Sequence, residues 1–326
     1  MKNVLFNALS VLCALMLLPL GAMPKSAKES VSDTVETGWT TNNVPYTGAP
    51  EKDVFRILIS QTGKVETLDA DTYITGVVAA EMPALYEVEA LKAQAVAAYT
   101  YACRKRAAAG DSEYDLTDDP EKDQCYISAE KMQEKWGDNT KTYTEKIANA
   151  VKSVSGQYLS YDNAPALTVY HAVSSGRTES CKNVWGSALP YLVPVDSLGD
   201  RLEENYLYTA EFTKEQITEK LKGLCDITGD TGDIFSQVKT TDSGRVTSIT
   251  VCGTELTGAQ IADALSLPSV NFKIAAKDNA FAVEVRGRGH GVGMSQYGAD
   301  YMAKQGSNYK DILLHYYTGC TLNENK

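Results

Sequence analysis

The alanine-rich stretch Val88–Ala109 constrains the fold of this chain more than any other segment. Apolar and small residues recur in it at helical spacing: Leu91, Ala95, Ala98 and Ala102. Gly110 follows as a natural helix stop. Alanine on one helix face lets a neighbouring element approach closely, so the sequence predicts a long central helix around which the rest of the domain packs.

Helices and strands are interspersed along the remaining chain. A helix is predicted at Leu68–Ala80, with Asp69 or Asp71 at its start and Pro83 just beyond its end. The other predicted helices are Ala129–Trp136, Thr144–Val154, Glu211–Leu224, Thr257–Leu265, Met294–Gln305 and Tyr309–Tyr316. The predicted strands are Val54–Ser60, Gln157–Tyr161, Ala166–Ala172, Phe235–Thr241, Thr247–Cys252, Phe272–Ala276 and Ala280–Arg286. This mixture predicts the α+β class, a mixed α/β domain with interspersed helices and strands.

The chain divides into three parts by composition. Residues 1–23 form an apolar segment, residues 24–50 are polar and predict a disordered tether, and residues 51–326 predict one folded domain. Residues 196–270 are a candidate for a smaller inserted lobe, although no clean linker marks its ends.

The run Val4–Met23 is long enough to span a bilayer, with Asn7 and Ser10 as its polar interruptions. A cleaved signal peptide is the alternative, but Leu20 is large where a cleavage site after Ala22 needs a small residue. We expect an uncleaved single-pass anchor. Both interpretations predict that the folded domain is exported from the cytoplasm.

The net charge and the cysteine pattern limit the ligands, metals and disulfides that the sequence predicts. A net charge of -11 repels phosphate backbones, so we expect no nucleic acid partner, and neutral sugars fit better. No recognised zinc spacing is present, and we expect no metal and no cofactor. Disulfides and free thiols both remain open for six cysteines: Cys103, Cys125, Cys181, Cys225, Cys252 and Cys320.

Glu81 is the candidate acid/base. It stands in Ala79-Ala80-Glu81-Met82-Pro83, at the end of an apolar helix. Weak solvation disfavours a charged carboxylate and raises its pKa, as a proton donor to a glycosidic oxygen requires near neutral pH. The alternative is a helix-terminal glutamate that faces solvent.

Two polar segments accompany this motif. His171–Glu179 is dense in hydroxyls and is compatible with sugar recognition, with a nucleophile arrangement or with a simple capping loop; it contains no G-x-S-x-G elbow. Arg286–Gly298 has glycine at every second position from Gly287 to Gly293, which lets a ligand or another backbone approach closely. A tight strand-to-helix turn would need the same glycines.

Five ordered motifs in this chain resemble the stage II sporulation protein D (SpoIID/LytB) family. They are Val78–Pro83, Leu91–Ala98, His171–Glu179 with Trp185-Gly186, Gly289–Gly298 and Asp311–Gly319. The resemblance covers residues 50–322. Two departures stand out: Tyr99 replaces an arginine that the family often has, and the loop before Tyr126 offers only Cys125 where some members place zinc ligands.

The resemblance implies a lytic transglycosylase that cleaves peptidoglycan glycan strands denuded of stem peptides and leaves anhydro-muramyl ends. It places the catalytic glutamate at Glu81. It also implies a role in septal wall thinning and engulfment during endospore formation. It also implies a membrane-bound septal complex with a wall amidase and an integral membrane protein. The alternative is a non-catalytic peptidoglycan-binding modifier of a wall amidase. We expect substrate contacts from His171, Ser174, Ser175, Gly176, Thr178, Glu179, His290, Gly291, Ser295 and Gln296.

Overall fold

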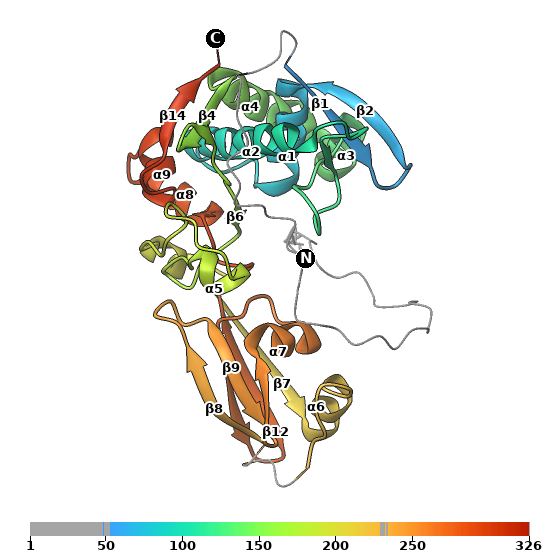
Figure 1. The fold of residues 1–326 in the computed structure, drawn as a ribbon, viewed down its shortest axis with the longest axis vertical. Coiled ribbons are helices and arrows are strands. Elements are labelled where there is room, and N and C mark those ends of the chain that lie inside the picture. Colours follow the sequence, from blue (N-terminus) through green and yellow to red (C-terminus); the bar gives the residue numbers. More distant parts are fainter. Residues whose placement is uncertain (1–47, 49–52, 229–231, 233, 326) are drawn as a thin grey trace, which may run out of the picture. The chain divides into compact units, whose positions relative to one another are not determined.

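The computed structural model describes residues 48, 53–228, 232 and 234–325 (Figure 1). The expected anchor, residues 1–23, and the expected tether, residues 24–50 apart from Gly48, lie outside this part of the chain. Within the described residues, no helix is both long enough and apolar enough to cross a membrane. Helices and strands are interspersed along them, which confirms the α+β class.

Helix α2, Val88–Ala109, is the central packing helix that the alanine pattern predicts. Its first four turns are largely buried, and Gly110 ends it with a φ of 53°. Its main neighbours (Figure 1) are the helices α1 (Ala70–Glu81), α4 (Thr140–Ser153), α8 (Gln296–Lys304) and α9 (Tyr309–Tyr316) and the strand β4 (Gln157–Tyr161).

Helix α1 begins at Ala70, because Asp69 caps it: the Asp69 side chain accepts a hydrogen bond from the Thr72 N–H. The expected start at Leu68 is wrong, since Leu68 belongs to strand β2 (Lys64–Asp69), which pairs antiparallel with β1 (Val54–Ile59). A short strand β3 (Leu116–Thr117) runs parallel to β1 on its other edge. Strand β2 was missed because most of its side chains are exposed.

A second sheet also packs against the C-terminal half of α2, where Thr100 Oγ1 accepts from the Leu159 N–H and Arg104 donates to the Pro165 carbonyl oxygen. Its order is β14 (Thr321–Glu324), β4 and β5 (Ala164–Pro165), and the turn between β4 and β5 has positive φ at both Asp162 and Asn163. Helix α3 (Ala129–Trp136), the short 3₁₀ helix η1 (Gly137–Asn139) and α4 precede this sheet in the chain. Helix α4 starts at Thr140 rather than at Thr144.

Residues 207–286 build a second hydrophobic core of their own. One sheet has the order β11 (Phe272–Lys277), β12 (Ala280–Arg286), β7 (Leu207–Thr213), and the other has the order β10 (Thr254–Thr257), β9 (Val246–Val251), β8 (Phe235–Thr240). Helices α6 (Lys214–Lys220) and α7 (Gly258–Leu265) complete it, and its buried residues run from Ile217 to Val285. This core extends past the expected lobe of residues 196–270, because β12 pairs with β7. Its independence as a lobe stays a prediction.

Three predicted elements are wrong in type over part of their length. Residues 211–213 are strand rather than helix, because β7 pairs with β12 as far as Thr213. The expected strand Ala166–Ala172 shrinks to β6 (Tyr170–His171), and residues 294–295 form strand β13 (Met294–Ser295) before α8 begins. Strands β6 and β13 pair with each other in parallel. At residues 211–213 and 294–295, strand pairing therefore overrides the local helical pattern.

The β6–β13 pair brings the two polar segments of the sequence together. Isolated bridges extend the contact, from Val173 to Arg288 and from Glu179 to Val292. The short helices α5 (Cys181–Trp185) and η2 (Leu198–Leu202) follow the first segment.

Candidate active site

Glu81 is the last residue of α1, and its neighbours in the sequence are apolar. Ala79 and Met82 on either side are almost fully buried. Burial raises the pKa of the Glu81 carboxyl from 4.5 to about 7. A hydrogen bond of 2.9 Å from the Cys125 backbone N–H to Glu81 Oε1 opposes the shift but does not cancel it. Near neutral pH the carboxyl is therefore present in both protonation states.

Two further side chains act on Glu81. The positive charge of Lys135 lowers the pKa of Glu81, and a hydrogen bond from Gln296 does the same to a smaller extent. Lys135 is held in place by the end of α1, since its Nζ donates to the carbonyl oxygens of Ala79 and Ala80 at 2.8 and 3.3 Å. Sequence reasoning missed Lys135, because a lysine on a polar helix gives no local signal of its partner.

A polar chain of side chains lies beside the acid. Tyr170 Oη donates to Gln124 Oε1 at 3.1 Å, and Gln124 Nε2 donates to Tyr73 Oη at 3.2 Å. Burial raises the pKa of both tyrosines, and the charge of Glu81 adds to the shift in each. Gln124, Cys125 and Tyr170 were not predicted as site residues. The Gln124-Cys125-Tyr126 triplet was the signal that could have pointed to this loop.

Gln296 is the predicted substrate residue that the structure places next to Glu81. Its Nε2 lies 3.5 Å from Gln94 Oε1, on the face of α2. Gln94 Nε2 is buried without a hydrogen-bond partner among the described residues. The start of α8 and the middle of α2 thus meet at the acid.

His171 and His290 form a second cluster beyond the β6–β13 pair. Their ring centroids are 5.7 Å apart, and Trp185 lies 5.0 Å from His290. His171 Nδ1 is 3.1 Å from the Val292 carbonyl oxygen, and His290 Nδ1 accepts from the Val292 N–H. Burial lowers the pKa of His171 to about 3 and of His290 to about 4. Both rings are therefore neutral hydrogen-bonding groups at neutral pH.

Glu179 joins the two polar segments to the second core. Its N–H donates to the Gly291 carbonyl at 2.7 Å, and its carboxylate accepts from Thr241 Oγ1 at 2.6 Å and from Ser243 Oγ. Ser180 N and Asn183 Nδ2 donate to the other carboxylate oxygen. Burial alone would raise the pKa of Glu179, but these hydrogen bonds lower it below its ordinary value.

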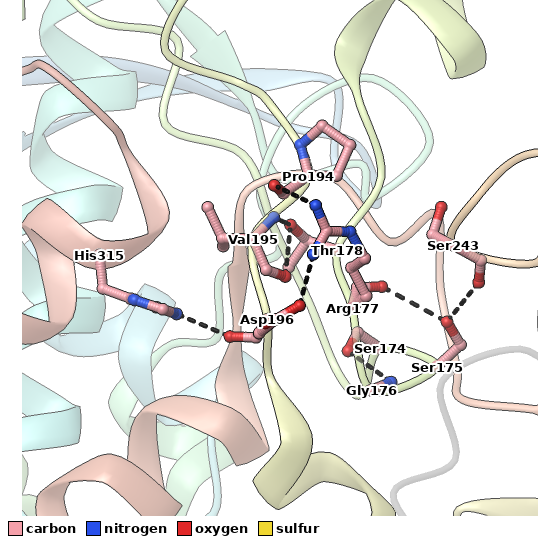
Figure 2. Close-up of polar contacts among 10 residues, drawn as sticks. All are labelled: Ser174, Ser175, Gly176, Arg177, Thr178, Pro194, Val195, Asp196, Ser243 and His315. Atoms are coloured by element: carbon pink, nitrogen blue, oxygen red, sulfur yellow. Dashed lines mark hydrogen bonds and ion pairs between the residues drawn. The ribbon is translucent and has the colours of Figure 1, made fainter.

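Several predicted substrate hydroxyls are already engaged within the protein. Thr178 Oγ1 accepts from the Val195 N–H, and Ser175 Oγ donates to the Ser243 carbonyl at 2.7 Å (Figure 2). Ser174 N and Ser295 Oγ both donate to the carboxylate of buried Asp200. These contacts hold the loops in shape, which favours a positioning role over direct sugar contact for Ser174, Thr178 and Ser295.

The loop of residues 174–178 is also fixed from outside. Figure 2 shows the Arg177 guanidinium directed to the Asp196 carboxylate, and His315 Nε2 lies 2.8 Å from the Asp196 carbonyl oxygen. Gly176 has a φ of 99°, and a Cβ there would lie 2.4 Å from Arg201 Nε. Glycine is therefore needed at this position for its backbone conformation, whereas the Arg201 side chain could move away from a Cβ.

The alternating glycines of the second segment allow a close approach of backbone. A Cβ on Gly293 would lie 2.0 Å from the Val169 carbonyl oxygen, and a Cβ on Gly287 would lie 2.6 Å from that of Val173. The strand that delivers His171 thus runs directly against this segment. Contact with another backbone is therefore seen, and the positive φ of Gly287, Gly289, Gly291 and Gly293 shows that these positions also need glycine for their backbone conformation.

Both polar segments line one pocket, to which Ser174, Ser175, Glu179, His290 and Gly291 contribute. Glu81 does not line that pocket. We predict that Glu81 and both loops share one groove, and this stays a prediction, as do the substrate roles of the individual residues.

Metal and disulfide chemistry find no support in the described residues. No group of three or more His, Cys, Asp or Glu side chains is arranged to hold a metal ion there. The six cysteines from Cys103 to Cys320 are free thiols. That the protein needs no metal or cofactor stays a prediction.

Comparison with known proteins identifies several relatives. The family model described as stage II sporulation protein, SpoIID, matches residues 59–161. Two proteins named stage II sporulation protein D are 35% and 34% identical to this chain, from Bacillus subtilis (strain 168) and Bacillus amyloliquefaciens. They match 97% and 99% of this chain and 94% and 96% of their own length. A Bacillus subtilis (strain 168) protein named amidase enhancer is 26% identical over 76% of this chain and 40% of its own length.

Proposed function

This chain belongs to the stage II sporulation protein D family, and from that premise we propose that it is a peptidoglycan lytic transglycosylase of endospore formation. The observation that carries the proposal is Glu81, a desolvated carboxyl with a pKa of about 7 at the end of α1. A group with that pKa donates and accepts a proton with similar ease at neutral pH.

In the first step, protonated Glu81 donates its proton to the glycosidic oxygen of the scissile bond. The bond from that oxygen to the anomeric carbon breaks, and the leaving sugar departs as an alcohol. Positive charge develops at the anomeric carbon, next to the newly formed Glu81 carboxylate. The neutral Gln296 amide and the Lys135 ammonium, which both lower the pKa of Glu81, stabilise that carboxylate.

In the second step, Glu81 takes the proton of the 6-hydroxyl group on the same sugar. The hydroxyl oxygen bonds to the anomeric carbon, which closes a 1,6-anhydro ring and returns Glu81 to its protonated form. No water is consumed, so one carboxyl replaces the pair that an ordinary glycosidase uses. Intramolecular attack also benefits from a high effective concentration of the hydroxyl.

The substrate in this proposal is the denuded glycan strand, and the setting is the sporulation septum. Residues 1–23 anchor the protein in the cell membrane with its domain outside the cytoplasm, where it thins the septal wall during engulfment. A wall amidase supplies denuded strands by removing stem peptides, and an integral membrane protein completes the complex. Retention of the segment is tested by intact mass of the protein recovered from its host membranes; a mature N-terminus near Met23 contradicts it.

Mass spectrometry of denuded glycan strands, after incubation with the full-length protein in detergent, tests the proposed reaction. Products with anhydro-muramyl ends support it. Glu81→Gln serves as the matched control, since it keeps the side-chain shape and an acceptor for the Cys125 N–H. Products with reducing muramyl ends would instead indicate ordinary hydrolysis and would contradict the proposal.

The alternative is a non-catalytic, peptidoglycan-binding modifier of a wall amidase. The relative named amidase enhancer favours this reading. The two readings predict different results when purified amidase is added to intact peptidoglycan. A modifier raises amidase turnover equally with the wild-type protein and with Glu81→Gln, whereas a transglycosylase acts on strands without any amidase.

A further inference from the structure

A small pocket lies where the loop after β6 meets the turn between β8 and β9. Its rim includes Ser175, Ser243 and Asn271, with backbone from Gly289 and Gly291. The cavity volume is about 30 Å³. A single water needs about 10–15 Å³ of such space, so the pocket accepts a group of carboxylate size.

The lining of this pocket is basic, in a chain whose net charge is -11. Three arginines contribute to it, Arg177, Arg245 and Arg286, against one carboxylate, that of Glu179. The Glu179 oxygens already accept four hydrogen bonds from the protein. This carboxylate is therefore fixed in place, and the arginine donors remain for a ligand.

Arg245 is the arginine with the most unused hydrogen-bonding capacity. It is half-buried, and among the described residues its guanidinium has no hydrogen bond and no carboxylate within 4.0 Å. Burial lowers the pKa of Arg245, and the charges of Glu179 and Asp263 oppose that effect only at longer range. A guanidinium always stays charged, so a partly buried one without close partners favours an anionic ligand.

Arg177 and Arg286 can assist. Each pairs with one exposed carboxylate outside the pocket, Asp196 and Glu284 respectively. Exposed ion pairs contribute little to stability, so these side chains can turn donors toward a bound anion at small cost.

We propose that this pocket binds the free lactyl carboxylate of a muramic acid residue, with Arg245 as its main partner. The proposal rests on the function proposed above and explains how the protein selects denuded strands. A stem peptide converts that carboxylate into an uncharged amide and attaches a chain too large for a pocket of about 30 Å³. A guanidinium matches a planar carboxylate with two parallel hydrogen bonds.

The pocket is connected to the acid through strand β6. His290 lines the pocket and hydrogen-bonds to the backbone of Tyr170. The Tyr170 side chain, in turn, lies within the electrostatic influence of Glu81. Tyr170 therefore touches a pocket-lining side chain through its backbone and responds to the Glu81 charge through its side chain.

Binding to two chemically matched strands tests the assignment. Full-length Glu81→Gln protein in detergent is titrated with denuded strands, and with the same strands after their carboxylates are coupled to methylamine. We expect the free carboxylate to lower Kd by about tenfold or more, as for a charged hydrogen bond. Arg245→Gln should abolish this difference, Arg245→Lys should retain part of it, and exposed Lys222→Gln should leave it intact.

Equal binding of the two strands by the Glu81→Gln protein overturns the assignment, and this comparison needs no change in the pocket. A folded Arg245→Gln variant that still discriminates overturns it as well. Failure of the proposed reaction looks different: the wild-type protein would form no anhydro ends while the carboxylate preference persists. Conversely, equal cleavage and equal binding of both strands would support the proposed reaction and contradict the proposed carboxylate site.

Discussion

The Cys125 backbone N–H donates a hydrogen bond of 2.9 Å to Glu81 Oε1. This bond ties the end of α1 to the loop that precedes α3, so the acid depends on a segment more than 40 residues away in the chain. One peptide N–H stabilises the carboxylate too weakly to offset burial, and the pKa stays at about 7. The carboxyl is thus suited to both halves of a proton transfer cycle.

Glu81 should set the pH dependence of the reaction. The first step needs the protonated form, so the rate of anhydro-product formation should fall as pH rises above about 7. Glu81→Gln should fold normally and lose roughly 10²-fold or more in rate. Initial rates between pH 5 and pH 9, measured by mass spectrometry of products, check both points. A rate that still climbs at pH 9 would exclude Glu81 as the donor.

The same carboxyl should make the fold less stable as pH rises. Between the ordinary pKa of 4.5 and about 7, the folded state binds more protons than the unfolded state, so stability falls with rising pH. Glu81→Gln stays neutral, and it should be more stable than the wild-type protein by about 1–3 kcal/mol at pH 8 and equal to it below pH 4.5. Urea unfolding at both pH values measures this, with exposed Glu145→Gln as the control. A constant difference at both pH values would contradict the pKa shift.

Lys135 should act on Glu81 through its charge. Lys135→Met removes a group that lowers the pKa of Glu81, so the high-pH limb of the rate profile should move to higher pH. The variant also leaves the Ala79 and Ala80 carbonyls without their side-chain donor, which costs about 1 kcal/mol. Lys131→Met on the same helix is the control. An unmoved profile would show that Lys135 is only structural.

Gly293 should tolerate no side chain. Gly293→Ala places a Cβ about 2.0 Å from the Val169 carbonyl oxygen at a φ of 72°, and it should cost at least about 3 kcal/mol. Gly306 has a φ of 93° but open space around it, so Gly306→Ala should cost about 1–2 kcal/mol, the conformational part alone. Thermal unfolding of the two variants separates the cost of the steric clash from the cost of the backbone conformation. Equal losses would mean that the Gly293 contact relaxes freely.

Glu179 should hold the second core against the site. Glu179→Ala leaves the Thr241 and Ser243 hydroxyls and the Asn183 amide without their acceptor, which should cost about 2–4 kcal/mol. Because its folded pKa is lowered, this contribution is present above the ordinary pKa of 4.5 and is lost as pH falls below it. Exposed Glu219→Ala is the control. If the wild-type protein were more stable than Glu179→Ala at pH 3 but not at pH 7, this assignment would be wrong.

The helical parts of the fold followed from local pattern. The limits of α2, α3 and α9 match their prediction, because each has apolar residues at helical spacing and a clear stop. Strand β2 and the pair β6–β13 could not be predicted, since their side chains are exposed or their pairing joins distant segments. A single sequence carries no signal for such partners.

The site divides in the same way. Glu81 was recognisable from its apolar neighbours at a helix end, and Gln296 from the glycine-rich motif. Lys135 and Gln124 were not, because each acts through a partner from another part of the chain. Arg245 was not either, because the pocket that it lines is formed by segments far apart in the sequence. Serine and threonine hydroxyls read as sugar ligands proved to bond within the protein, which only the three-dimensional arrangement reveals.

The chain departs for the second core at Leu207 and returns at Arg286, and these two residues pair across β7 and β12. The β6–β13 contact joins residues roughly 120 positions apart, which is a long loop to close from an unfolded chain. Once the second core has formed, its two ends are already adjacent, and the loop left to close is far shorter. The order of folding then matters. The second core contains no part of the proposed catalytic residue Glu81, yet its formation sets how quickly β6 and β13 pair.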